Sequence, residues 1–171
     1  MSVSMYQISI PVCVRALTNL DNILRKSQEF ALNEKVDESV LLNSRLALNM
    51  FPLVRQVQIA SDISKGIGSR LAGIENLKFD DTEKSFAELY ERLYKTVEYL
   101  NSIRPEQLDG SDEKTVELKL PGIQMSFKGI DYLLSFAFPN LFFHITTAYN
   151  ILRHNGVDLG KADYLGDLPS L

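Results

Sequence analysis

The chain has 171 residues, the length of about one domain, and we expect a single folded domain over residues 1–171. Hydrophobic side chains make up 45% and charged side chains 23% of the sequence. These values exclude an intrinsically disordered chain, which has fewer apolar and more charged residues. The net charge of -4, with no cluster of Lys and Arg, argues against nucleic acid as a partner.

Cysteine content and hydropathy bear on the compartment. Cys13 is the single cysteine, so an intramolecular disulfide and a zinc site built from several cysteines are both excluded. The first fourteen residues carry no Lys or Arg, and no stretch reaches the ~18 apolar residues that a bilayer-spanning helix needs. We therefore expect a cytoplasmic protein that does not associate with a membrane.

The first predicted helix covers residues 11–32, with Pro11 in its first turn, where proline is tolerated. Its apolar residues recur at three-and-four spacing, which indicates one buried face. That face holds Cys13, Ala16, Leu17, Leu20, Ile23, Leu24 and Phe30. Residues 33–49 keep no such period, and we interpret them as a connector that wraps the bundle.

The second predicted helix begins near Asn49, so that Pro52 falls in its first turn, and ends at Gly73. The third opens at Asp80, with Glu83 three residues on in a capping-box pattern. On its outer face we expect two ion pairs at i,i+4 spacing, between Glu88 and Arg92 and between Glu91 and Lys95. Its buried face holds Phe86, Leu89, Leu93, Val97 and Leu100.

Residues 115–128 alternate between apolar and polar side chains, which predicts a β-hairpin whose turn contains Pro121 and Gly122. The last long helix begins near Leu133, is cut or bent at Pro139, and ends at Gly156. The tail, residues 157–171, is expected to lie along the surface. The pattern as a whole predicts an all-α, mainly helical four-helix bundle with a small hairpin in the crossover before the last helix.

Two polar side chains fall on apolar helix faces. His144 shares its face with Leu141 and Ala148, and Gln56 falls beside Leu53, so both are expected inside the bundle and within reach of each other. The pair can line a ligand site, or it can be a structural hydrogen bond between two helices.

Three further side chains are of types that carry chemistry in other proteins. Tyr149, on the flank of the last helix, is a third ligand-binding candidate or a boundary residue. Asp62 is interpreted as a solvated carboxylate and Cys13 as a buried thiol rather than a nucleophile. Phosphate-binding, dinucleotide-binding, HExxH, EF-hand and GxSxG motifs are missing from the sequence, so no catalytic residue is assigned.

Three segments resemble an uncharacterised bacterial branch of the DinB/YfiT-like superfamily of four-helix bundles. They are NMFPLVRQVQIASDISKGIGSRLAG (49–73), DDTEKSFAELYERL (80–93) and FPNLFFHITTAYNILRHNGVDLGKADYLG (138–166). Metal-binding members of that superfamily hold a divalent ion with one histidine of the second helix and an HxxxH pair on the last, and some carry out thiol-dependent transferase or isomerase reactions. The resemblance places Ala148 and Leu152 at the paired positions and Gln56 nearest to the third.

Apolar side chains at two of three ligand positions cannot coordinate a cation, so we expect no metal cofactor. Our first hypothesis is a DinB-like bundle without an intact metal site, which binds a small ligand between its helices or acts through an oligomer interface. The alternative is a metal-dependent thiol transferase or isomerase with a remodelled site at His144. We also consider a homodimer in which Phe138, Phe142 and Phe143 of the last helix pack against a second copy.

Overall fold

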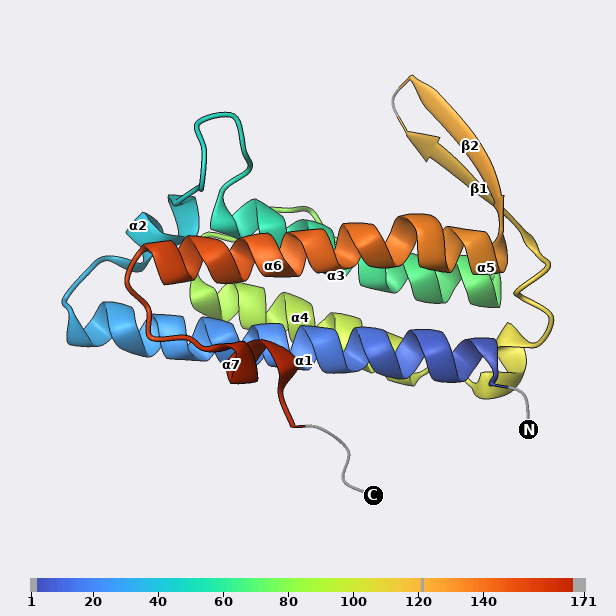
Figure 1. Cartoon of the computed structure of the whole chain (residues 1–171), viewed down its shortest axis with the longest axis horizontal. Coiled ribbons are helices and arrows are strands. Elements are labelled where there is room, and N and C mark those ends of the chain that lie inside the picture. The colour runs from blue at the N-terminus through green and yellow to red at the C-terminus, as the bar shows by residue number, and fades with distance from the viewer. Residues whose placement is uncertain (1–2, 121, 168–171) are drawn as a thin grey trace.

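The computed structural model describes residues 3–120 and 122–167, which form the expected mainly helical bundle with one small hairpin (Figure 1). Its four long helices are α1 (Met5–Asn33), α3 (Leu53–Ala72), α4 (Phe86–Asn101) and α6 (Phe138–His154). α1 and α6 run in one direction and α3 and α4 in the other, as the chain colours show. Because α3 and α4 are parallel, residues 73–85 return along the length of the bundle between them; we call this segment the return connector.

The hairpin between β1 (Thr115–Leu120) and β2 (Ile123–Lys128) is confirmed. Val116 lies opposite Phe127 in the register, and Leu118 lies opposite Met125. Val116 and Leu118 are buried, and the Phe127 ring lies 5.9 Å from that of Phe136, so the apolar face of the hairpin packs on the segment before α6. Gly122 has a positive φ of 77°, as the expected turn requires, while Pro121 lies outside the described residues.

The first helix starts earlier than predicted, because a capping box formed by Ser4 and Gln7 begins it at Met5. Pro11 therefore lies inside α1 rather than in its first turn. Both Gln7 and Pro11 are exposed, so water can hydrogen-bond the Gln7 carbonyl that Pro11 leaves without a donor. The predicted connector also contains a short helix, α2 (Glu38–Asn43), whose N-terminus is capped by Asp37.

The starts of α3 and α4 differ from the prediction as well. Pro52 caps α3 instead of lying in its first turn, and Gly73 ends that helix in the left-handed conformation, as expected. Asp80 does not begin α4, because Asp81 has a φ of 53°, which interrupts any helix there. The capping box belongs to Ser85 and Glu88.

The last helix is not cut at Pro139. After the short 3-10 turn η1 (Pro105–Leu108) and the hairpin, the chain is helical from α5 (Gly129–Asp131) through the π-helical turn η2 (Tyr132–Ala137) into α6. Pro139 has no backbone N–H, and in a regular α-helix its ring would clash with the carbonyl four residues earlier. The wider π-helical turn before Pro139 accommodates it without ending the helix. Gly156 then has a positive φ of 95°, and the tail contains a further helix, α7 (Lys161–Leu165), that the sequence did not predict.

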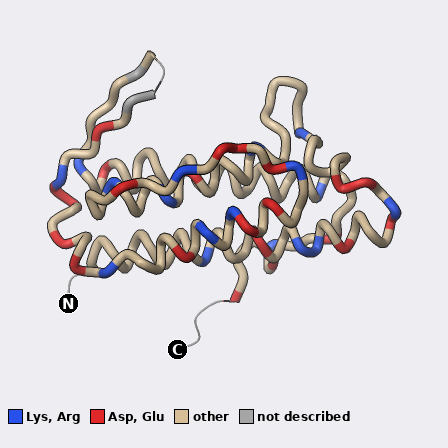
Figure 2. Tube along the Cα trace, turned by 180° about the vertical axis from the view of Figure 1, so that it is seen from behind, with Lys and Arg blue, Asp and Glu red and all other residues tan. Residues whose placement is uncertain are grey.

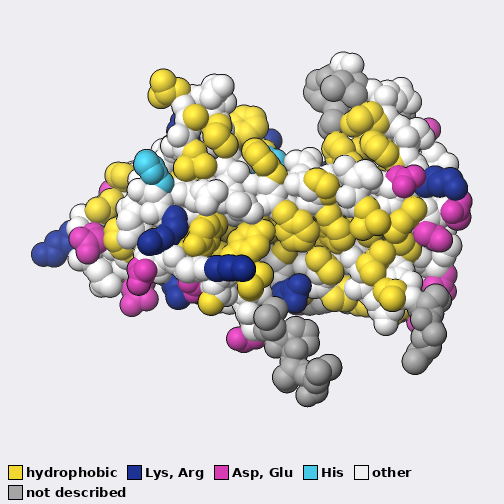
Figure 3. Space-filling view, viewed as in Figure 1, with side chains coloured by type: hydrophobic (Ala, Val, Ile, Leu, Met, Phe, Trp, Pro, Cys, Tyr) yellow, Lys and Arg dark blue, Asp and Glu magenta, His cyan; other side chains and the backbone are white. Residues whose placement is uncertain are grey.

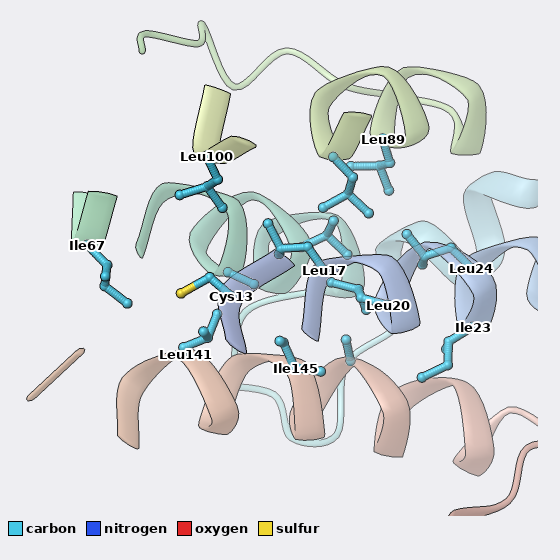
Figure 4. Packing of buried hydrophobic residues seen from close by; sticks show 14 of the residues in the cluster. Cys13, Leu17, Leu20, Ile23, Leu24, Ile67, Leu89, Leu100, Leu141 and Ile145 are labelled. Atoms are coloured by element: carbon cyan, nitrogen blue, oxygen red, sulfur yellow. The ribbon is translucent and has the colours of Figure 1, made fainter. Parts of the chain in front are cut away.

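The core joins all four long helices (Figure 4). Cys13, Leu17 and Leu20 of α1 point toward Leu89 of α4 and Leu141 and Ile145 of α6, and all six are buried. No helix among the described residues is long and apolar enough to cross a bilayer.

Packing in the core fixes the inward-facing positions of α3 and α6. Both candidate residues, Gln56 on α3 and His144 on α6, lie at such positions.

Candidate functional site

Gln56 of α3 and His144 of α6 meet as predicted. The His144 Nδ1 atom lies 2.7 Å from the Gln56 Oε1 atom, and the Gln56 Nε2 atom donates to the carbonyl oxygen of Phe51 at 2.9 Å. Gln56 is fully buried and His144 is 9% exposed. The amide thus connects the imidazole with the loop that precedes α3.

This arrangement fixes the protonation state of the imidazole. A carbonyl can only accept, so the Gln56 nitrogen faces Phe51 and its oxygen faces His144, and Nδ1 must carry the hydrogen. Burial and the nearby charge of Arg55 lower the pKa of His144 below its usual value, which keeps the ring neutral at pH 7. Nε2 is then a lone-pair acceptor, and none of the residues in 3–120 and 122–167 hydrogen-bonds to it.

Aromatic residues flank the pair on two elements. Phe143 packs edge-on against the His144 ring with a centroid distance of 5.3 Å, and its own side chain is exposed. Phe51, whose carbonyl accepts from Gln56, also has an exposed side chain. Its loop is closed at the base by the backbone bond from Leu53 N to Ser44 O, 2.9 Å long. Apolar surface of Phe143 therefore borders the imidazole on α6, and the backbone of the Phe51 loop holds its Gln56 partner.

The structure does not bring the third candidate to this pair. The Tyr149 hydroxyl donates to the carbonyl of Leu159 at 3.3 Å, and its ring packs edge-on against Tyr164. Five residues along α6 from His144, Tyr149 points about 140° away around the helix. It holds the C-terminal segment, and the second histidine, His154, is exposed at the end of α6.

The described residues do not fit the metal site of the superfamily. Ala148 and Leu152, at the positions of the histidine pair, are buried apolar side chains, and Gln56 is engaged with His144 and Phe51. Within the described part of the chain, no three His, Cys, Asp or Glu side chains are grouped so that they could hold a metal ion. These side chains therefore do not offer a divalent cation the donor set of the superfamily site.

A second polar cluster lies between α3, α4 and the return connector, and sequence reasoning missed it. Arg92 is 1% exposed rather than on an outer face, and it does not pair with Glu88. Its guanidinium contacts Asp62 at 2.6 Å, Asp81 at 2.7 Å and Glu83 at 2.8 Å. We call these four residues the Arg92 cluster. Helical spacing indicated this burial, because Arg92 lies three residues after the buried Leu89 and four before the buried Thr96, on the inner side of α4.

Two further cations balance the cluster. Lys65 pairs with Asp62 at 3.0 Å and Arg55 pairs with Asp81, so three cations face three carboxylates. Asp62 is therefore half-buried and ion-paired, at 35% exposure, and not the solvated carboxylate that the sequence predicted.

Two carboxylates of the cluster, those of Asp81 and Glu83, are held ionised. Burial opposes ionisation of Asp81, but hydrogen bonds from Arg55 and Arg92 outweigh it and lower the pKa of its carboxyl. Burial likewise opposes ionisation of Glu83, and the bonds from Arg92 and Gln58 help to lower its pKa. The Phe79 ring, 4.5 Å below the Arg92 guanidinium, completes the enclosure. Every charge is partnered, so the cluster fastens the return connector and leaves no group free for a ligand.

Cys13 is fully buried, as predicted. Burial raises the pKa of its thiol to about 12, against a weaker opposing effect of Ser64. The thiolate is the nucleophile of cysteine chemistry, and it does not form in this environment at neutral pH.

Comparison with known proteins places this geometry in a family. None of the curated proteins compared with the chain matches it. The family described as "Domain of unknown function (DUF1993)" matches residues 5–165. The crystal structure of a DinB family member protein from Shewanella denitrificans is 41% identical with a TM-score of 0.90, over 98% of this chain and 94% of that one. The chain therefore belongs to the DUF1993 family of DinB-like helical bundles.

Proposed function

We propose that this protein binds a small organic molecule through the Nε2 atom of His144. One observation carries the proposal: a neutral, nine-tenths buried imidazole whose Nδ1 is occupied by Gln56, while no described residue bonds to its Nε2. Nε2 is not among the fully buried described atoms that lack a partner, so the lone pair is open to solvent and a donor group of a ligand can reach it.

The surroundings favour a ligand with a neutral hydroxyl or thiol group on an apolar body. A hydroxyl or thiol donates to the free lone pair of Nε2. The exposed ring of Phe143, packed against the imidazole, offers apolar surface to the rest of the molecule. The charge of Arg55, which acts on the imidazole, disfavours a cationic ligand.

Nuclear magnetic resonance of the side-chain nitrogens tests the proposal, because the chain has only two histidines. At pH 7.5 we expect one imidazole, that of His144, with hydrogen on Nδ1 and none on Nε2. Titration with benzyl alcohol and with benzyl mercaptan should shift the Nε2 resonance of His144 saturably with at least one of them. Benzylamine, which carries the same ring and a cationic group, should not do so.

Two variants give the matched controls. His144→Phe removes the observed nitrogen, so binding to both variants is followed through the backbone amide resonance of the neighbouring Phe143. Its saturable response should be lost in His144→Phe and unchanged in His154→Phe, at the exposed histidine of the same helix. An Nε2 that carries hydrogen in the free protein, or equal responses in both variants, would contradict the proposal.

A further inference from the structure

One side of the bundle carries no charge over a long distance. Between Tyr132 and Leu152, through η2 and α6, the sequence contains no Asp, Glu, Lys or Arg, and none occurs in α1 between Met5 and Val14. Seen from behind, acidic and basic residues alternate along the opposite side, where α4 and the return connector lie (Figure 2). A helix exposed to water on its outer face normally carries charged residues there.

The uncharged parts of α1 and α6 border a common groove. Its volume is about 270 Å³, and Val12 and Ala16 of α1 face Phe142 and Ile145 of α6 across it. Helical spacing extends this lining to Ile8 on α1 and to Phe138 and Leu134 on the last helix. The side chains of Tyr164 and Leu165 in α7 also line the groove, and Arg15 is the charged residue among its described lining.

We call this surface, from Leu134 and Ile8 to the groove, the α1–α6 face. In the right half of Figure 3 hydrophobic side chains form a band along it, with charged side chains at its right-hand end and lower edge. The Phe138 and Phe142 rings pack together on it, 5.6 Å apart. Phe143 lies off this face, against His144, so the structure divides the three phenylalanines of the last helix.

We propose that the α1–α6 face binds the same face of a second copy, antiparallel, with the two-fold axis near Phe138. A two-fold interface uses one patch twice, so that patch must contain both a projection and the hollow that receives it. Leu134, 53% exposed, is the projection, and the groove beside Phe142 is the hollow. Leu134 lies four positions before Phe138, and Phe142 lies four positions after it. A two-fold rotation about an axis at Phe138 therefore places Leu134 of one copy over Phe142 of the other.

Charge favours a second copy over other occupants. Each chain has a net charge of -4, so two copies approach each other most favourably through a surface with little charge, such as this one, where Arg15 is the charged residue of the described groove lining. A membrane surface is a poorer partner, because peripheral binding to anionic lipid depends on clustered Lys and Arg, which this face lacks. An aromatic surface whose charged residue, Arg15, is exposed matches an identical one without leaving a carboxylate or cation buried and unpaired.

The dimensions point to a weak dimer. Residues 132–145 extend about 21 Å at 1.5 Å per residue, and two helices side by side are about 20 Å wide. Contact over that rectangle covers about 400 Å² per copy, or about 800 Å² in all, below the size of a standard specific interface. We therefore expect a dimer that dissociates on dilution.

Sedimentation equilibrium over a range of concentrations tests the assembly. The mass of the wild type should rise from 19.3 kDa toward twice that value as concentration increases. Leu134→Lys should remain monomeric at every concentration, whereas Tyr94→Lys, at an equally exposed apolar residue of α4, should behave as the wild type. A wild-type mass that stays at 19.3 kDa, or a dimer that survives Leu134→Lys, overturns the proposal.

Cysteine cross-linking tests the position of the axis. The native Cys13 is fully buried, so it contributes no background. Phe138→Cys should form a disulfide-linked dimer under mild oxidation, because a residue on a two-fold axis meets its own counterpart. Glu91→Cys, on the exposed side of α4, is the control and should remain monomeric. Cross-linking of the control but not of Phe138→Cys would assign the interface to another face.

Discussion

The two polar sites of this bundle lie on opposite sides of α3 and are built on different principles. Toward α4, the Arg92 cluster buries a full positive charge and surrounds it with three carboxylates. Toward α6, Gln56 and His144 form a neutral pair in which Nε2 has no partner among the described residues. The cluster is electrostatically complete, whereas the pair has one bond still to make.

The difference separates structural polarity from polarity that can serve binding. A buried charge persists only when its partners are in place, so the Arg92 cluster fixes the position of the return connector. A neutral imidazole tolerates an open lone pair at lower cost, and this makes it the better candidate for a ligand. Burial alone does not distinguish a structural polar side chain from one that is available to a ligand. The two differ in whether all their donors and acceptors already have partners in the protein.

The largest expected effect breaks the cluster. Arg92→Met leaves Asp62, Asp81 and Glu83 without their shared cation, and we expect a loss of about 3–5 kcal/mol in the free energy of unfolding. Urea denaturation at pH 7 measures this loss. A loss below about 1 kcal/mol would mean that the cluster does not hold the connector.

An intermediate effect sharpens the assignment of the neutral pair. The pKa of His144 is lowered in the folded state, so between that lowered value and its ordinary value of 6.5 the unfolded chain binds more protons. Stability should therefore fall as pH decreases below about 6.5, by at most about 1.4 kcal/mol per pH unit. His144→Gln, which retains a donor toward Gln56, should remove this dependence when thermal unfolding is followed from pH 8 to pH 5. Acid sensitivity identical to that of the wild type would show that the imidazole is not the group responsible.

The smallest expected effect contrasts a surface ion pair with the buried cluster on the same helix. Glu91 and Lys95 form the predicted i,i+4 pair at 3.1 Å, and both side chains are exposed. Glu91→Gln should cost only about 0.2–0.5 kcal/mol, and less in high salt. A cost comparable to that of Arg92→Met would remove the distinction between the two kinds of pair.

Periodicity in the sequence predicted the long helices, the hairpin and the meeting of Gln56 with His144. Those predictions succeeded because each depends on the regular spacing of one element. Arg92 was misplaced for a related reason: its favourable spacing from Glu88 suggested a local pair, whereas its real partners come from the return connector and α3. Contacts with an irregular segment leave no period in the sequence.

Helix starts were the other weakness, and capping explains why. Pro11, Pro52 and Asp80 were plausible first-turn or cap residues, but the helices begin after Ser4, Pro52 and Ser85. At Ser4 and Ser85 both hydrogen bonds of a capping box form. These bonds decide where α1 and α4 begin, against the preference of Pro11 and Asp80 for a helix start. A left-handed residue such as Asp81 decides the choice at α4, and a single sequence does not reveal it.

The π-helical turn before α6 sets the relation between the hairpin and the rest of the last helix. A π-helical turn contains one residue more than an α-helical turn, so removing the exposed Ser135 and replacing Pro139 by alanine would restore regular geometry. The hairpin would then rotate by about 100° relative to the imidazole of His144. A change of a single residue in the length of this segment can therefore reorient the β1–β2 hairpin, while the inward positions of α6 keep their phase.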